Sequence, residues 1–113
     1  MQEQRTHPRK QIEKKIEITD INSGDVLGSL VNISLGGFML ISSAEQPLNQ
    51  LFQLRIDFPA PIDGETGIDL GAESLWCNDA TGPGSFWTGF QIIDISDQGM
   101  ELVQRLIDNW AVS

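Results

Sequence analysis

The strongest constraint on the fold is a repeated pattern of short segments in which apolar and polar residues alternate. The clearest is LFQLRIDF at 51–58, where every second residue from Phe52 to Phe58 is apolar. Successive side chains on a β-strand point to opposite faces, so this alternation predicts a strand with one buried face. Comparable segments predict five further strands, at about 15–19, 26–33, 38–42, 67–77 and 86–93.

Turn-forming sequences separate these segments. NSGD at 22–25, PAPIDGETG at 59–67 and NDATGPG at 78–84 combine Gly, Pro, Asn and Asp, the residues that favour turns. Gly71 lies inside a predicted strand and suggests a β-bulge. Six short strands joined by such turns predict an antiparallel barrel or a sandwich, and the alternation alone does not distinguish these two folds.

The hydrophobic period changes near the C-terminus. Met100, Val103, Ile107 and Trp110 recur at the spacing of an amphipathic helix. Ser96 or Asp97 is suited to cap its first turn. We expect a helix at 96–110 whose apolar stripe covers an open end or side of the β-structure. The 113 residues fit a single domain, 1–113, with an N-terminal arm at 1–14, the β-structure at 15–93 and this helix.

Charge is distributed unevenly along the chain, whose net charge is −9. Residues 1–15 carry five basic and two acidic residues, whereas residues 16–113 carry two basic and 14 acidic ones. An acidic body disfavours binding to nucleic acid or to an anionic membrane. The arm contains Pro8, which disfavours a helix, and we expect it to be extended and exposed. An anion site should therefore be local and built around the arm.

The sequence also bears on the cellular compartment. Its one cysteine, Cys77, cannot form an internal disulfide. No stretch approaches the roughly 20 apolar residues of a membrane helix, and no apolar segment follows the polar N-terminus as in a secretory signal. These features predict a cytoplasmic protein without membrane insertion.

The stretch LVNISLGGFML, Leu30–Leu40, interrupts an apolar run with two polar residues and two glycines. One interpretation is a bend between two strands, in which Asn32 and Ser34 close backbone hydrogen bonds. The other is a binding site, since glycine lets a ligand approach the backbone and side chains two residues apart on a strand share a face.

A pair of arginines favours the binding site. Arg5 and Arg9 lie four residues apart on the arm. The planar guanidinium group pairs with phosphate oxygens or with guanine O6 and N7, and it can stack on a purine. Together with the polar strand end, these groups suit a small phosphodiester that contains guanine.

These residues carry a resemblance to a known family. Arg5-x-x-x-Arg9 followed by Asn32-x-Ser34-x-x-Gly37 resembles the RxxxR and (D/N)xSxxG pair of PilZ domains, bacterial receptors for the second messenger cyclic di-GMP. FWTGFQI at 86–92 is similar to the last barrel strand of that family. The resemblance covers nearly the whole chain, in order and with similar spacing.

The resemblance implies a mainly β fold: a six-stranded antiparallel β-barrel with a C-terminal helix, an extended N-terminal arm and no catalytic activity. It implies that Arg5 and Arg9 hold phosphate and guanine, while Asn32, Ser34 and Gly37 line the other side of the pocket. The Asn32 carbonyl can accept from guanine. An aspartate would accept more strongly, by about 1–2 kcal/mol. Gly37 leaves room for the ligand and can take a positive φ.

Four residues are candidates for secondary ligand contacts: Gln4, Lys10, Gly36 and Trp76. Many relatives have an arginine in place of Gln4, so its missing charge favours one ligand per chain over a stacked pair. Trp76 can stack on guanine, although a core or barrel-surface position is the favoured interpretation for it and for Trp87. Lys10 would add positive charge at the rim or remain solvated.

We therefore expect a receptor that changes shape on binding cyclic di-GMP and passes the signal to a partner protein. It would act as a monomer, with a dimer as the alternative, and without a metal or other cofactor. His7 is the one histidine, and the sequence contains no nucleophile elbow, phosphate-binding loop or metal-ligand spacing. An enzyme is therefore not predicted.

Two other functions stay open. The first is a PilZ-like adaptor that has lost the nucleotide and acts through protein contacts in pilus assembly or motility, although such relatives usually lack the arginines. The second is a small barrel that binds a different anionic metabolite at the same arm.

Overall fold

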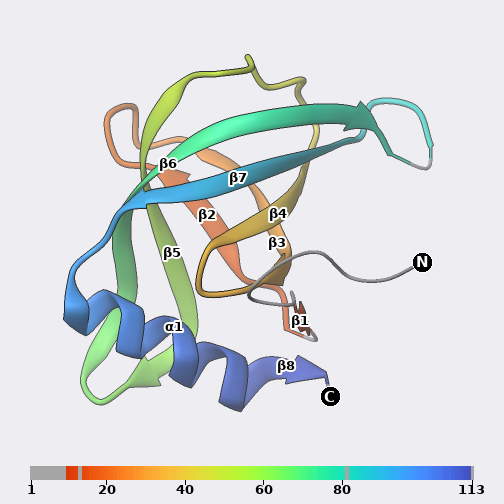
Figure 1. The fold of residues 1–113 in the computed structure, drawn as a ribbon. Helices are drawn as coiled ribbons and strands as arrows, with labels where there is room; N and C mark the ends of the chain where they lie inside the picture. The colour runs from red at the N-terminus through yellow and green to blue at the C-terminus, as the bar shows by residue number, and fades with distance from the viewer. Residues whose placement is uncertain (1–9, 13, 81, 113) are drawn as a thin grey trace, which may run out of the picture.

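A computed structural model describes residues 10–12, 14–80 and 82–112 of the chain (Figure 1). These residues form eight strands and one helix. Their bounds are β1 Lys10–Ile12, β2 Glu17–Asp20, β3 Val26–Ile33, β4 Gly37–Ser42, β5 Leu51–Ile62, β6 Glu65–Asp79, β7 Phe86–Asp94, α1 Asp97–Trp110 and β8 Ala111–Val112.

Six of the strands close into a barrel. The sheet order runs β2-β5-β6-β7-β4-β3, and an additional β2–β3 pairing joins its two ends. All of these pairings are antiparallel. The six strands predicted from the alternation are therefore present, and closure selects the barrel over the sandwich.

The barrel interior explains the alternation. Ile16, Ile18, Leu54 and Ile56 are fully buried, as their spacing predicted. Phe38 and Phe90 stack inside the barrel with ring centroids 5.1 Å apart. Such a core contributes roughly 25 cal/mol for each Å² of apolar surface that is removed from water.

The helix α1 covers the lower end of the barrel, as Figure 1 shows. Its side chains Leu102, Val103 and Leu106 are buried in the same core as the strands. Ser96 caps the helix, because its side chain accepts a hydrogen bond from the Gly99 amide at 2.9 Å. The predicted C-terminal helix and its closing role are confirmed. Within the described part of the chain, no helix has the length and apolar character to cross a membrane.

Two short strands extend the sheet beyond the barrel. β1 pairs with the end of β3 through Lys10–Ile33 and Gln11–Asn32, along the same edge that β2 occupies earlier in β3. β8 then pairs with β1. The last part of the predicted arm is thus hydrogen-bonded to the strand that carries Asn32.

The predicted long turn at 59–67 is wrong. β5 continues to Ile62 and β6 begins at Glu65, so only Asp63 and Gly64 form the loop. Both have positive φ, 51° and 82°, as a two-residue hairpin turn requires. The prolines at 59 and 61 lie where the β5–β6 register shifts. Proline has no N–H to donate to the neighbouring strand, and an irregular part of the ladder tolerates this loss.

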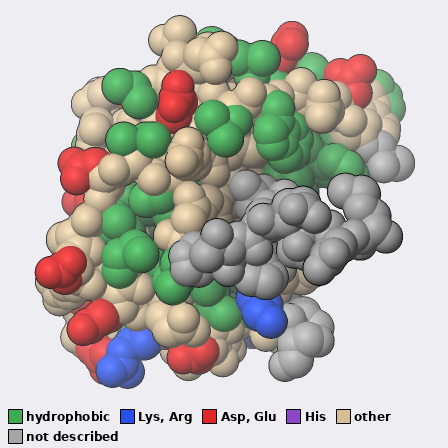
Figure 2. Space-filling view, viewed as in Figure 1, with side chains coloured by type: hydrophobic (Ala, Val, Ile, Leu, Met, Phe, Trp, Pro, Cys, Tyr) green, Lys and Arg blue, Asp and Glu red, His purple; other side chains and the backbone are tan. Residues whose placement is uncertain are grey.

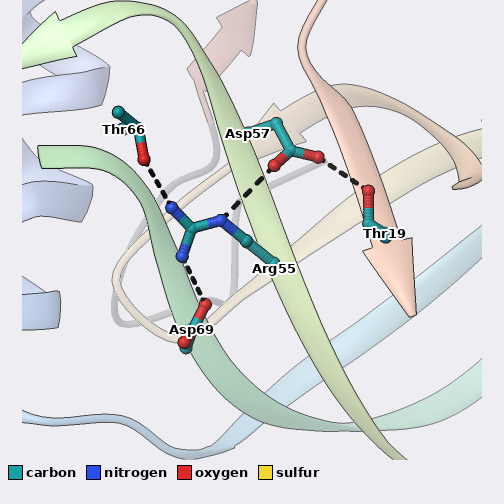
Figure 3. Close-up of polar contacts among 5 residues, drawn as sticks. All are labelled: Thr19, Arg55, Asp57, Thr66 and Asp69. Atoms are coloured by element: carbon teal, nitrogen blue, oxygen red, sulfur yellow. Dashed lines mark hydrogen bonds and ion pairs between the residues drawn. The ribbon is translucent and has the colours of Figure 1, made fainter. Parts of the chain in front are cut away.

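A polar network fastens three barrel strands on the outer face (Figure 3). Arg55 on β5 donates to Asp69 and to Thr66 at 2.7 Å each, and its Nε lies 3.5 Å from Asp57. Thr19 on β2 donates to the same Asp57 at 2.7 Å. The network therefore connects β2, β5 and β6, which are neighbours in the sheet order.

We predict that Arg55→Ala lowers the free energy of unfolding by about 1 kcal/mol, and that Arg105→Ala lowers it by less than about 0.5 kcal/mol. Arg105 is the matched control because, among the described residues, it makes a single exposed ion pair, with Asp63 at 3.1 Å. Urea denaturation at low and high salt measures both effects, and salt should reduce the Arg55 effect. Equal losses for the two variants would contradict a role for the network.

Candidate functional site

The hairpin between β3 and β4 is closed by Ser34. Its amide donates to the Gly37 carbonyl at 2.8 Å, and its hydroxyl donates to the same carbonyl at 3.4 Å. The hydroxyl also accepts from the Gly36 amide at 3.2 Å. Ser34 is buried and lies just beyond Ile33, the last residue of β3. Its side chain thus shapes the turn, as the bend interpretation proposes.

The same hairpin is bound to β7. The Gly36 carbonyl accepts from the Ile92 amide at 2.9 Å, and Gly37 pairs with Gln91. Gly37 is buried, whereas Gly36 is exposed. Among the described glycines, positive φ occurs at Gly24, Gly64, Gly82 and Gly84. The positive φ expected at Gly37 is therefore wrong: Gly37 has ordinary strand geometry at the start of β4.

A β-bulge turns Asn32 to the outer face of the barrel. Leu30 is buried and pairs with Leu40, but the next pair is Asn32 with Met39, so Val31 is an extra residue. Without this bulge, Asn32 would share the inner face with Leu30, two residues earlier. Bulges of this kind re-aim side chains next to functional sites.

Asn32 holds a hydrogen-bond acceptor that no other described residue uses. The residue is only 9% exposed, and its Oδ1 has no hydrogen-bond partner among the described residues. A buried polar atom without a partner costs roughly 1–3 kcal/mol, and such atoms are rare in folded proteins. A donor brought by a ligand would remove this cost, so Asn32 is the best candidate for a specificity contact.

Trp76 reaches the outer face by a second bulge. Ser74 is fully buried and pairs with Phe90, while Trp76 pairs with Gly89, which makes Leu75 the extra residue. The indole lies directly on the backbone of Gly89, where an added Cβ would overlap the ring. Sequence analysis missed Gly89, although a glycine inside a strand is a known signal for such close approach.

Cross-strand pairing places the two re-aimed side chains in one row on the outer face. The row consists of Gln11, Asn32, Met39, Gly89 and Trp76. Three strand-to-strand steps separate Asn32 on β3 from Trp76 on β6, which is half of the way around the closed six-stranded barrel. The row therefore follows the curved outer surface, with Asn32 at one end and Trp76 at the other.

The positive charge for an anion must come from outside these strands. β3, β4, β6 and β7 contain no Lys or Arg. Lys10 is exposed and pairs with Ile33, beside Asn32 on the neighbouring pair. Gln4, Arg5 and Arg9 lie outside the described residues. Lys10 therefore lies on the ladder pair next to Asn32, at the end of the row opposite Trp76.

Two cavities lie elsewhere on the molecule. One of about 150 Å³ lies at the start of α1 and is lined by residues that include Arg55, Asp69 and Gln98. The other, of about 330 Å³, is lined by residues that include Lys15, Asp57 and Phe58. The residues of the row line neither of these two cavities. Within the described residues, no three His, Cys, Asp or Glu side chains are grouped to hold a metal ion.

Comparison with solved structures shows the same fold in two bacteria. Escherichia coli YcgR in complex with c-di-GMP aligns with a TM-score of 0.71 at 18% identity, covering 93% of this chain and 45% of that one. The PilZ domain of YcgR with c-di-GMP aligns with a TM-score of 0.72 at 16% identity, covering 96% and 92%. Bacillus subtilis inhibitor of motility, MotI/DgrA, aligns with a TM-score of 0.72 at 15% identity, covering 94% and 50%.

The chain thus spans about half the length of the YcgR and MotI chains and nearly all of the isolated domain. At these identities the likeness shows the fold alone. No curated protein sequence matches the chain. A family model, described as PilZ domain, matches residues 3–109. The chain therefore belongs to the PilZ domain family, as its paired arginine and asparagine–serine–glycine sequences suggest.

Proposed function

We propose that this protein is a receptor for cyclic di-GMP and not a catalyst. The nucleotide would lie on the outer face of the barrel, between Arg5 and Arg9 of the arm and the Asn32–Gly37 hairpin. The observation that carries the proposal is the buried Oδ1 of Asn32, which has no hydrogen-bond partner in the described part of the chain and lies on the strand to which β1 is paired. The c-di-GMP complexes of YcgR, a relative in fold, support the choice of ligand.

The chemistry of guanine matches the free acceptor. Guanine offers N1–H and N2–H₂ as donors on one edge, and Asn32 Oδ1 can accept from one of them. Ser34 and Gly37 act differently from Asn32, because their mutual hydrogen bonds hold the turn in place. In this proposal Asn32 recognises the base through a hydrogen bond, and Ser34 and Gly37 hold the conformation of the neighbouring turn.

The two phosphates would be neutralised by the arm. Arg9 directly precedes Lys10, so the β1–β3 pairing tethers the arginine-bearing segment to the strand that carries Asn32. Guanidinium groups bind phosphate through two parallel hydrogen bonds. Closure of the arm over the ligand would create a new surface, which a partner protein would recognise. The likeness to an inhibitor of motility makes a motility component a reasonable partner.

Trp76 would provide a stacking platform at the far end of the row. Stacking of a base on an aromatic side chain contributes about 1–3 kcal/mol. The indole is held flat by Gly89 and is half-buried, so one of its faces is already supported. Trp87 also faces outward but pairs with Asn78 and lies outside the row, which makes it a useful control.

Calorimetric titration with cyclic di-GMP tests the main proposal. Wild type should bind one molecule per chain, since Gln4 lacks the charge to help neutralise a second one. Arg5→Ala and Arg9→Ala should each weaken binding at least about tenfold, the loss of one charge-assisted hydrogen bond. Lys14→Ala is the matched control in the same segment and should bind normally.

The absence of heat with wild type at tens of micromolar ligand would refute the nucleotide receptor and favour an adaptor that acts through protein contacts. Equal competition by GTP, cyclic GMP or cyclic di-AMP would instead indicate a different anionic metabolite.

Asn32→Asp should raise affinity about tenfold, because a carboxylate accepts guanine donors more strongly than an amide does. The same change should destabilise the empty protein by about 1–3 kcal/mol, since it buries a charge without a partner. Asn32→Ala should weaken binding while leaving the fold intact. Parallel titration and urea denaturation measure both quantities; tighter binding by Asn32→Ala than by wild type would contradict the assigned contact.

Tryptophan fluorescence tests the stacking platform. Ligand should quench emission in wild type and Trp87→Phe, and the quenching should be much smaller in Trp76→Phe. Gly89→Ala should displace the indole and weaken binding several-fold even though residue 89 itself offers the ligand no side chain. Unchanged quenching in Trp76→Phe would show that the indole is only part of the barrel surface.

A further inference from the structure

A second ordered surface lies on the outer face at the loop between β4 and β5, residues 43–50. Ser74 on β6 is fully buried and binds this loop: its hydroxyl donates to the Pro47 carbonyl at 2.6 Å, and its amide donates to the Gln50 carbonyl at 3.0 Å. The Ser74 carbonyl accepts from the Asn49 amide at 2.7 Å. These bonds hold residues 47–50 firmly against β6.

Three exposed leucines adjoin these anchored residues. Leu48, Leu51 and Leu75 are 45%, 74% and 42% exposed, and each is a chain neighbour of a residue in the Ser74 bonds. Asn49, between the first two, has a φ of 57°, a left-handed conformation that asparagine tolerates better than most other residues. We call the three leucines the leucine surface. Exposed apolar side chains that gather within a polar rim mark interaction sites.

The charge around the leucine surface is acidic. Leu51 pairs directly with Glu73 across the β5–β6 ladder, and Glu45 is exposed in the same loop. Residues 16–54 and 56–104 contain no Lys or Arg, and Arg55 is engaged by Asp57 and Asp69. On the face drawn in Figure 2, the acidic side chains of the described residues are spread over the left side and the top, and the basic ones lie in its lower part.

We propose that the leucine surface docks a protein segment in which aliphatic or aromatic side chains are flanked by Lys and Arg. The leucines would supply the apolar contact, and Glu45 and Glu73 would attract and orient the basic flanks. A second copy of the barrel is a poor occupant, because the same acidic rims would face each other. This surface shares no residue with the proposed nucleotide site, so neither proposal depends on the other.

Two synthetic peptides test the proposal. Both carry the same leucine and phenylalanine residues, and the intervening positions are Lys and Arg in one and Glu in the other. Fluorescence anisotropy should show that wild type binds the basic peptide and not the acidic one. The double variant Leu51→Ser/Leu75→Ser should bind the basic peptide at least tenfold more weakly. Ile93→Ser, which removes an equally exposed apolar residue from β7, should bind it as wild type does.

Weaker binding by the serine variants could also result from misfolding, so a charge-reversal variant provides a second test. Glu73→Lys keeps all three leucines, and it should weaken the basic peptide and allow the acidic peptide to bind. Circular dichroism confirms the fold of each variant. Equal binding of the basic peptide by wild type and the double variant, or no binding to either, would overturn the proposal. Self-association of wild type that the serine substitutions abolish, measured by analytical ultracentrifugation, would overturn it in favour of a second copy.

Discussion

The structure depends on the strict alternation of side chains between the inside and the outside of a closed barrel. Each strand residue must face the core or solvent, and a single inserted residue reverses the choice for all that follows. Two such insertions, at Val31 and Leu75, turn Asn32 and Trp76 outward. The outward directions of Asn32 and Trp76 therefore depend on the strand register and not on residue type alone.

The described strands separate the hydrogen-bonded β3–β4 hairpin from the nearest basic residue, Lys10 on β1. The hairpin at 34–37 is held by its own hydrogen bonds and by β7, above the stacked pair Phe38 and Phe90. β3, β4, β6 and β7 carry no basic residue, so positive charge beside the hairpin must come from another segment. β1, which begins with Lys10, adds to the edge of β3 and lies between that strand and β8. The start and end of the described chain thus meet beside the same residues.

Glycine has a similar use in two places on the outer face. Gly89 lies beneath the indole of Trp76, and Gly67 lies beneath the guanidinium of Arg55. In each case the missing side chain lets a large planar group from the neighbouring strand lie flat on the sheet. One such group joins β5 to β6 in the network of Figure 3, and the other forms the end of the proposed ligand row.

The sequence by itself determined the strands, the capped helix and the family resemblance, because hydrophobic period, turn residues and the spacing of the paired sequences can be read locally. It placed Val26–Ile33 correctly as a strand and Ser96 among the possible caps. Only the tertiary structure decided barrel closure, the tight Asp63–Gly64 turn, the role of Ser34 inside its hairpin and the outward direction of Asn32. A bulge or a closing pair is defined by the partner strand, which lies far away in the chain, so no local pattern could reveal it.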